Sequence, residues 1–108
     1  MATRLEGPYT SQSIAVTDET QVLHIYSTHT AGHRGMTFLV YSSAIAATAT
    51  VKYIEPGGGE RILSTAAVPA GGTDATVLDY DFSVPEAKLY ITLGSASAST
   101  ITAEAMVY

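Results

Sequence analysis

Apolar and polar residues alternate along several short segments of the chain. Between Ile45 and Glu55 every second residue is apolar, and the same period recurs in 89–93 and 101–107. Successive side chains of a β-strand point to opposite faces of the sheet, so each segment predicts a strand with one face toward a core. The alanines in 44–49 would also suit a helix, but the threonines between them favour a strand. The pattern therefore predicts an all-β protein.

Glycine and proline interrupt the pattern about every ten to twenty residues, as expected of short strands. Eight strands are predicted, near residues 13–17, 21–28, 36–43, 45–55, 60–68, 75–82, 88–94 and 99–108. Pro56-Gly57-Gly58-Gly59 predicts a hairpin turn. Eight antiparallel strands without a helix to cover one sheet predict a single two-sheet β-sandwich. An immunoglobulin-like order remains an alternative, but the absence of the Cys and Trp of antibody-type domains favours a jelly roll.

The N-terminal segment does not share this periodicity. Residues 1–13 include Gly7-Pro8 and show no alternation, so we expect an extended N-terminal arm followed by a sandwich domain over 14–108. Such an arm either docks on a neighbouring molecule or frays. Residues 1–8 contain no apolar run and no stretch approaches the roughly 20 residues of a membrane span, so neither a signal peptide nor a membrane partner is expected.

Composition narrows the classes of function. The 108 residues allow one domain, and 46% apolar with 14% charged residues is typical of a globular chain. Five basic residues stand against ten acidic ones, which disfavours a nucleic-acid partner because phosphates require Lys and Arg. The chain has no Cys, which excludes disulfides, thiolate metal sites and a thiol nucleophile.

Two groups of residues could carry chemistry. His24, His29 and His33 lie within ten residues, as a small cupin-like metal-binding protein would require, but their spacing fits no metal motif. Asp79 and Asp81 share one face of a predicted strand, where they more simply keep an outer face soluble. The glycine-rich turn lacks the residues of a phosphate-binding loop. We therefore predict no catalytic residue, no metal, no cofactor and no enzyme activity.

The residues opposite the core give the stronger signal. Segments 21–28 and 36–43 are apolar on both faces, so one face of each has nothing within a small sandwich to cover it. Exposed apolar patches commonly mark protein contacts, where Tyr and Met are enriched. The alternation assigns a protein-contact face to Tyr26, Tyr41, Tyr90, Met106 and Tyr108. It predicts a homo-oligomer, a dimer or a trimer.

The whole chain resembles, in style, the small all-β decoration or cement proteins of tailed-bacteriophage virions. The likeness rests on the leaderless start, the missing Cys, and short Ala/Ser/Thr-rich strands such as Leu89-Tyr-Ile-Thr-Leu-Gly94 and Ser99-Thr-Ile-Thr-Ala-Glu-Ala105. It implies a jelly roll, often dimeric or trimeric, that stabilises a capsid shell by protein contacts without catalysis. It also implies a place in the virion after assembly in the host cytoplasm. A carbohydrate-binding β-sandwich, with Tyr as the platform in place of the absent Trp, is the main alternative.

Overall fold

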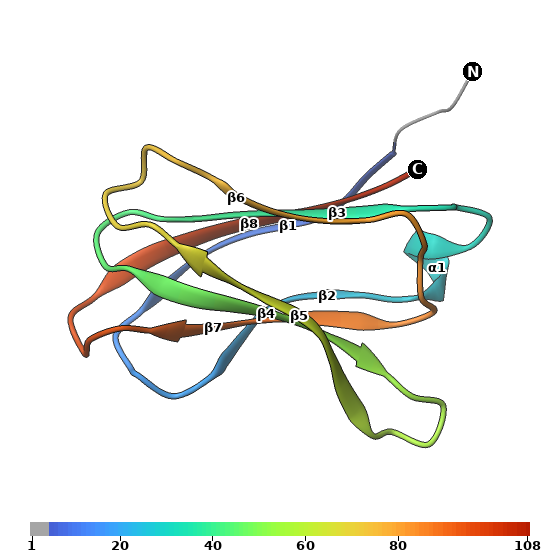
Figure 1. Cartoon of the computed structure of the whole chain (residues 1–108), viewed down its shortest axis with the longest axis horizontal. Helices are drawn as coiled ribbons and strands as arrows, with labels where there is room; N and C mark the ends of the chain where they lie inside the picture. Colours follow the sequence, from blue (N-terminus) through green and yellow to red (C-terminus); the bar gives the residue numbers. More distant parts are fainter. Residues whose placement is uncertain (1–4) are drawn as a thin grey trace.

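The computed structural model describes the backbone of residues 5–108 and the side chains of residues 8–27 and 30–108 (Figure 1). Its elements are β1 (Leu5–Ile14), β2 (Thr20–Ile25), α1 (Ser27–Thr30), β3 (Met36–Ser42), β4 (Ala47–Ile54), β5 (Glu60–Val68), β6 (Thr76–Tyr80), β7 (Ala87–Leu93) and β8 (Ser99–Val107). The helix α1 is a single turn. Within residues 5–108 the structure holds no helix with the length and hydropathy of a membrane span.

The eight strands form two antiparallel sheets of four, which lie as two layers in Figure 1. One sheet has the order β1-β8-β3-β6 and the other the order β2-β7-β4-β5. The first and last strands are neighbours, and the chain passes repeatedly from one sheet to the other, which is the strand order of a jelly roll. The predicted all-β two-sheet sandwich is confirmed, and the strand order favours the jelly roll over the immunoglobulin-like alternative.

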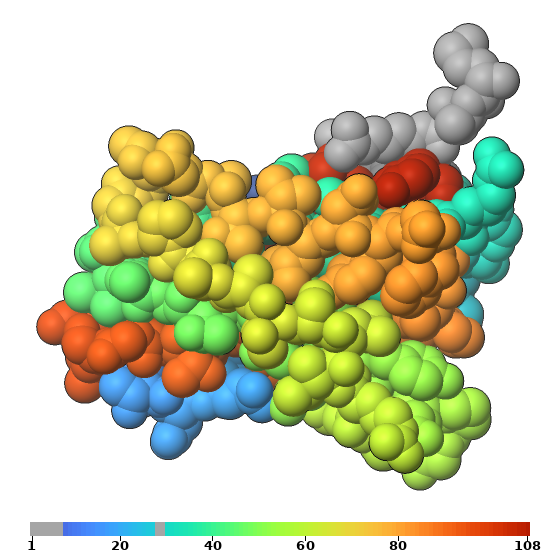
Figure 2. Space-filling model, in the orientation of Figure 1, coloured from blue at the N-terminus to red at the C-terminus, as the bar shows by residue number. Residues whose placement is uncertain are grey.

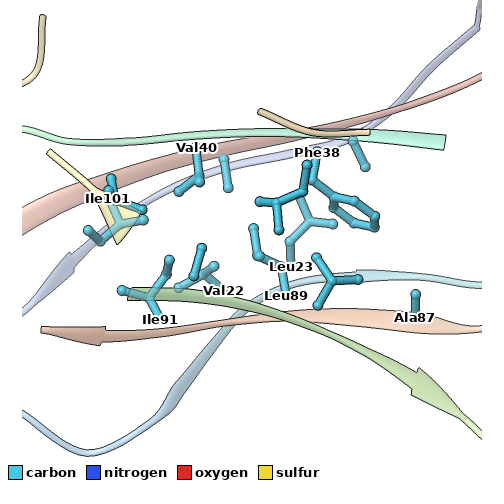
Figure 3. Close-up of a cluster of buried hydrophobic side chains, with 14 of the residues drawn as sticks. Val22, Leu23, Phe38, Val40, Ala87, Leu89, Ile91 and Ile101 are labelled. Atoms are coloured by element: carbon cyan, nitrogen blue, oxygen red, sulfur yellow. The ribbon is translucent and has the colours of Figure 1, made fainter. Parts of the chain in front are cut away.

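The core lies between the sheets and is built from the inward half of each alternating strand (Figure 3). Leu89 and Ile91 of β7 face Phe38 and Val40 of β3 across the gap, and all four are fully buried. The predicted inward residues of β7 and β8 are all buried, and β7 shows a strict two-residue burial period. In β4 the inward residues Ala47, Ala49 and Val51 are buried, while Tyr53 is half-buried. Phe82, whose place two residues after Tyr80 predicts an inward side chain, lies beyond the end of β6 and is 44% exposed.

The N-terminus differs from the expectation. Residues 5–13, which we expected in an extended arm, lie in β1, the edge strand that pairs with β8; residues 1–4 lie outside the described residues. The predicted strand at 13–17 is correspondingly displaced. Gly7-Pro8 sits where the register shifts between Glu6 and Tyr9, a bulge on an edge strand, where proline removes no ladder hydrogen bond. Thr10 and Gln12 occupy inward positions, so no apolar period marks the strand.

The segment 21–28 also differs. A register shift between Gln21 and Leu23 turns both Val22 and Leu23 into the core, so β2 has no uncovered apolar face. The predicted uncovered apolar face on this strand is therefore wrong. The strand ends at Ile25, before α1. In β3 both faces carry apolar side chains, as predicted. Phe38 is fully buried, while Tyr41 on the opposite face is 39% exposed.

The β4–β5 hairpin is confirmed. The Glu55 amide donates to the Gly59 carbonyl at 2.8 Å, and Gly58 has φ of 93°, a conformation that favours glycine. The hairpin reaches away from the body of the sandwich, as the yellow-green segment in Figures 1 and 2 shows.

Candidate functional site

A row of side chains crosses the outer face of the β1-β8-β3-β6 sheet. Strand pairing aligns Tyr9 of β1 with Glu104 of β8, Glu104 with Leu39 of β3, and Leu39 with Val77 of β6. Tyr41 lies one pair further along β3, opposite Thr102. We call this surface the tyrosine face; its residues are Tyr9, Leu39, Tyr41, Val77, Thr102 and Glu104.

The tyrosine face is apolar and open to solvent. Tyr9 is 66% exposed and Val77 is 56% exposed, which is unusual for large apolar side chains on one sheet face of a small domain. A shallow groove of about 150 Å³ runs among Tyr9, Tyr41, Leu39 and Glu104. Two aromatic rings with a groove between them form a surface that another molecule can cover.

Glu104 lies in the middle of this apolar row. It is half-buried, and no lysine or arginine of residues 8–27 and 30–108 forms an ion pair with it. The hydroxyl of the nearby Thr102 forms a hydrogen bond with the Ser11 hydroxyl, with 3.4 Å between the two oxygens. A carboxylate in an apolar surface favours a partner that brings a cation or hydrogen-bond donors.

A polar cluster borders the tyrosine face at the C-terminal end of β8. The Tyr108 hydroxyl donates to Asp79 Oδ1 at 3.1 Å, and the Thr37 hydroxyl donates to the same carboxylate oxygen. Asp79 therefore serves as an acceptor for two side chains, while Asp81 lies exposed beyond β6. Both aspartates are exposed, as the expected solvent-facing position on an outer face requires.

The opposite sheet carries a network of charges on its outer face. Lys52 Nζ lies 2.6 Å from Glu19 and 4.4 Å from the centre of the Tyr90 ring. The Tyr90 hydroxyl donates to both oxygens of Glu60, at 3.0 Å each. Partial burial, this hydrogen bond and the charges of Glu60 and Glu19 raise the pKa of Tyr90 to about 12. Tyr90 is thus committed to contacts within the chain.

The structure does not bring the five predicted contact residues onto one surface. Tyr41 and Met106 lie on the outer side of the β1-β8-β3-β6 sheet, but Met106 is only 8% exposed. Tyr108 closes the neighbouring polar cluster, and Tyr90 belongs to the opposite sheet. Tyr26 is 46% exposed at the end of the sandwich, next to α1. Of the five, only Tyr41 belongs to the tyrosine face. The strand register places Tyr9, Val77 and Glu104 beside it, and that register could not be predicted from the alternation.

The histidines do not gather into a described metal site. His24 Nε2 lies 2.6 Å from Glu86 Oε2, and the His24 ring packs on Tyr26 with ring centres 4.2 Å apart. Among the residues with described side chains, no group of three or more histidine and acidic residues is placed to hold a metal ion. The side chain of His29 lies outside the described residues.

A second hollow, of about 350 Å³, opens at the end of the sandwich beside α1. Its walls come from the β4–β5 hairpin, the start of α1 and the residues just before β7, and we call it the end pocket. It is lined by Tyr26, Ser27, Tyr53, Ile54, Glu55, Pro56, Gly58, Pro85 and Glu86. Alternation along the chain could not predict this pocket, because three segments that are distant in the sequence form it.

No family model and no curated protein matches the sequence. Solved structures that share the fold include the following two. The Yersinia pseudotuberculosis-derived mitogen aligns with a TM-score of 0.66 and 12% identity, over all of this chain and 88% of the mitogen. PirA aligns with a TM-score of 0.63 and 12% identity, over 88% of this chain and 90% of PirA. At this identity the likeness shows a common architecture.

Proposed function

We propose that the chain is a non-enzymatic structural module that acts through protein–protein contacts, first with copies of itself. The observation that carries this proposal is the tyrosine face, an apolar row across all four strands of one sheet with a half-buried carboxylate at its centre. Covering such a face releases ordered water and is favourable in proportion to the apolar area removed from solvent.

A second copy of the chain has a surface with complementary chemistry. On β5, beside the hairpin turn, the Ile62 side chain is 62% exposed and that of Arg61 is 73% exposed. Ile62 suits the groove between Tyr9 and Tyr41. Arg61 supplies a positive charge that can pair with the Glu104 carboxylate. Arg61 already contacts Glu55 through Nε at 2.8 Å, but a guanidinium has further donors.

The Glu104 carboxylate also bears on how two copies can be arranged in the contact. If two tyrosine faces met across a two-fold axis, two Glu104 carboxylates would be buried close together, which is costly without compensating cations. A head-to-tail contact places the hairpin of one copy on the tyrosine face of the next and avoids this cost. Such contacts form a ring when the rotation between successive copies closes and an open filament when it does not. We propose the closed form, as a trimer.

An oligomer of this kind displays each weak binding surface several times. Multivalent display strengthens attachment to a repetitive assembly without any new contact. We therefore propose the shell of a virus capsid as the larger partner, in line with the resemblance to decoration proteins, and the virion as the place of action.

Light scattering coupled to size exclusion, over a range of concentrations, tests the proposed self-association. We expect an oligomer that Tyr41→Ser converts toward monomer, with the dissociation constant raised about tenfold or more, because interface aromatics contribute about 1–2 kcal/mol or more. Tyr26→Ser is the matched control, since Tyr26 is similarly exposed but lies outside the tyrosine face. A wild-type protein that remains monomeric at high concentration would overturn the proposal.

A further inference from the structure

We propose that the end pocket is a binding site for a neutral saccharide, such as the terminal sugar residue of a glycan. This inference goes beyond the proposed self-association, because the end pocket and the tyrosine face share no residue. At about 350 Å³, the pocket falls at the small end of the volumes found for small-molecule sites.

The walls of the end pocket supply flat apolar surfaces. Tyr26 is exposed at one side and Tyr53 is half-buried at another, and Pro56 and Pro85 complete the lining. A sugar ring presents C–H groups on its faces and hydroxyls around its edge. Aromatic side chains suit such a ligand, because each has an apolar ring and, in tyrosine, a hydroxyl at the tip.

Two carboxylates in the lining are held in place by neighbours. Glu86 Oε2 contacts His24 Nε2 at 2.6 Å, and Glu55 Oε1 accepts from Arg61 Nε at 2.8 Å. Within the described side chains, no hydrogen bond reaches the second oxygen of either carboxylate. Each is therefore a positioned acceptor for a ligand hydroxyl, with its orientation already fixed by the first contact.

The charge of the pocket favours a neutral ligand over a cation. Among the residues with described side chains, no lysine or arginine lines the end pocket, and two carboxylates alone would attract an ammonium group. Glu55, however, is already paired with Arg61, and Glu86 with the His24 ring. Arg61 offsets the charge of Glu55, and the His24 ring occupies one oxygen of Glu86. The remaining acceptor oxygens stay available, and an uncharged polyol needs only acceptors.

Saturation-transfer NMR with a panel of free sugars tests this site. The panel contains glucose, galactose, mannose, N-acetylglucosamine and N-acetylgalactosamine, and tetramethylammonium serves as the cationic probe. We expect transfer to at least one sugar, its loss in Tyr26→Ala, and affinity about tenfold weaker in Glu86→Gln, because a hydrogen bond to a charged acceptor becomes one to a neutral amide. Tyr41→Ala, an exposed tyrosine outside the pocket, should bind as the wild type does.

Three results would overturn the inference: no transfer to any sugar of the panel, transfer to tetramethylammonium alone, or sugar binding that survives Tyr26→Ala. Because Tyr26 and Tyr41 are both exposed and lie on different surfaces, the two substitutions separate this site from the proposed interface. Loss of sugar binding with an unchanged oligomer mass in Tyr26→Ala supports the end pocket independently of self-association.

Discussion

Tyr90 and Glu60 form a phenol–carboxylate pair on the outer face of the β2-β7-β4-β5 sheet, and this pair makes stability depend on pH. The folded protein raises the pKa of Tyr90 from 10.0 to about 12, so it favours the neutral phenol. The contribution of the pair to stability is complete below pH 10 and is lost as the pH rises through about 12, since the unfolded chain releases its proton first.

Removing the carboxylate charge should lower this pKa. In Glu60→Gln the hydrogen bond to a charged acceptor and the repulsion between phenolate and carboxylate are both lost, so we expect the Tyr90 pKa to move back toward 10.0 while part of the burial effect remains. The difference between the phenolate absorbance titrations of the Glu60→Gln protein and of the same variant with Tyr90→Phe isolates this one group. An unchanged pKa would mean that Glu60 does not act on Tyr90.

At the level of the elements, alternation predicted seven of the strands close to their observed positions. The strand predicted at 60–68 coincides with β5. The failures have a common cause in the bulges. Gly7-Pro8 looks like the end of an element, but on the edge strand β1 it is a bulge within the ladder. The bulge in β2 likewise places two successive residues, Val22 and Leu23, in the core, which no strict period of two allows.

The same scale explains why the candidate sites were only partly predictable. Alternation identified Tyr41 as outward-facing, but only the register between strands places Glu104 beside Tyr9. The ion pair between Lys52 and Glu19 joins residues that are 33 positions apart in the sequence. Such a pair depends on the strand order, which alternation does not predict. The one-turn helix α1, which borders the end pocket, lies where strand continuation was expected.

Strand β4 offers a direct test of its two faces. Val51 is fully buried, so Val51→Asp places an unpaired charge in the core and should cost about 3 kcal/mol or more, a large share of a stability of about 5–15 kcal/mol. Thr48→Asp, on the outward face of the same strand, should change the free energy of unfolding by only about 0.5 kcal/mol. Urea denaturation measures both. Comparable stability of the two variants would contradict the assignment of faces.

The two sides of the whole molecule have different character. On the outer face of the β2-β7-β4-β5 sheet, charged side chains pair with one another: Lys52 and Lys88 both form ion pairs with Glu60. The tyrosine face on the other side keeps Glu104 without an ion pair in the part of the chain with described side chains. Head-to-tail assembly requires two different, complementary patches on one molecule. The tyrosine face is one, and the exposed Ile62 and Arg61 of β5 in the opposite sheet supply the other.

Reversing charges tests this direction of assembly. If Arg61 of one copy meets Glu104 of the next, Glu104→Lys and Arg61→Glu should each weaken the oligomer, because each brings like charges together in the contact. The double variant restores opposite charges in reversed order and should regain most of the oligomer mass in light scattering. Both side chains lie on outer surfaces of the sandwich, so circular dichroism should show all three variants folded. If Glu104→Lys strengthened the oligomer, or the double variant stayed dissociated, the hairpin would not be the partner of the tyrosine face.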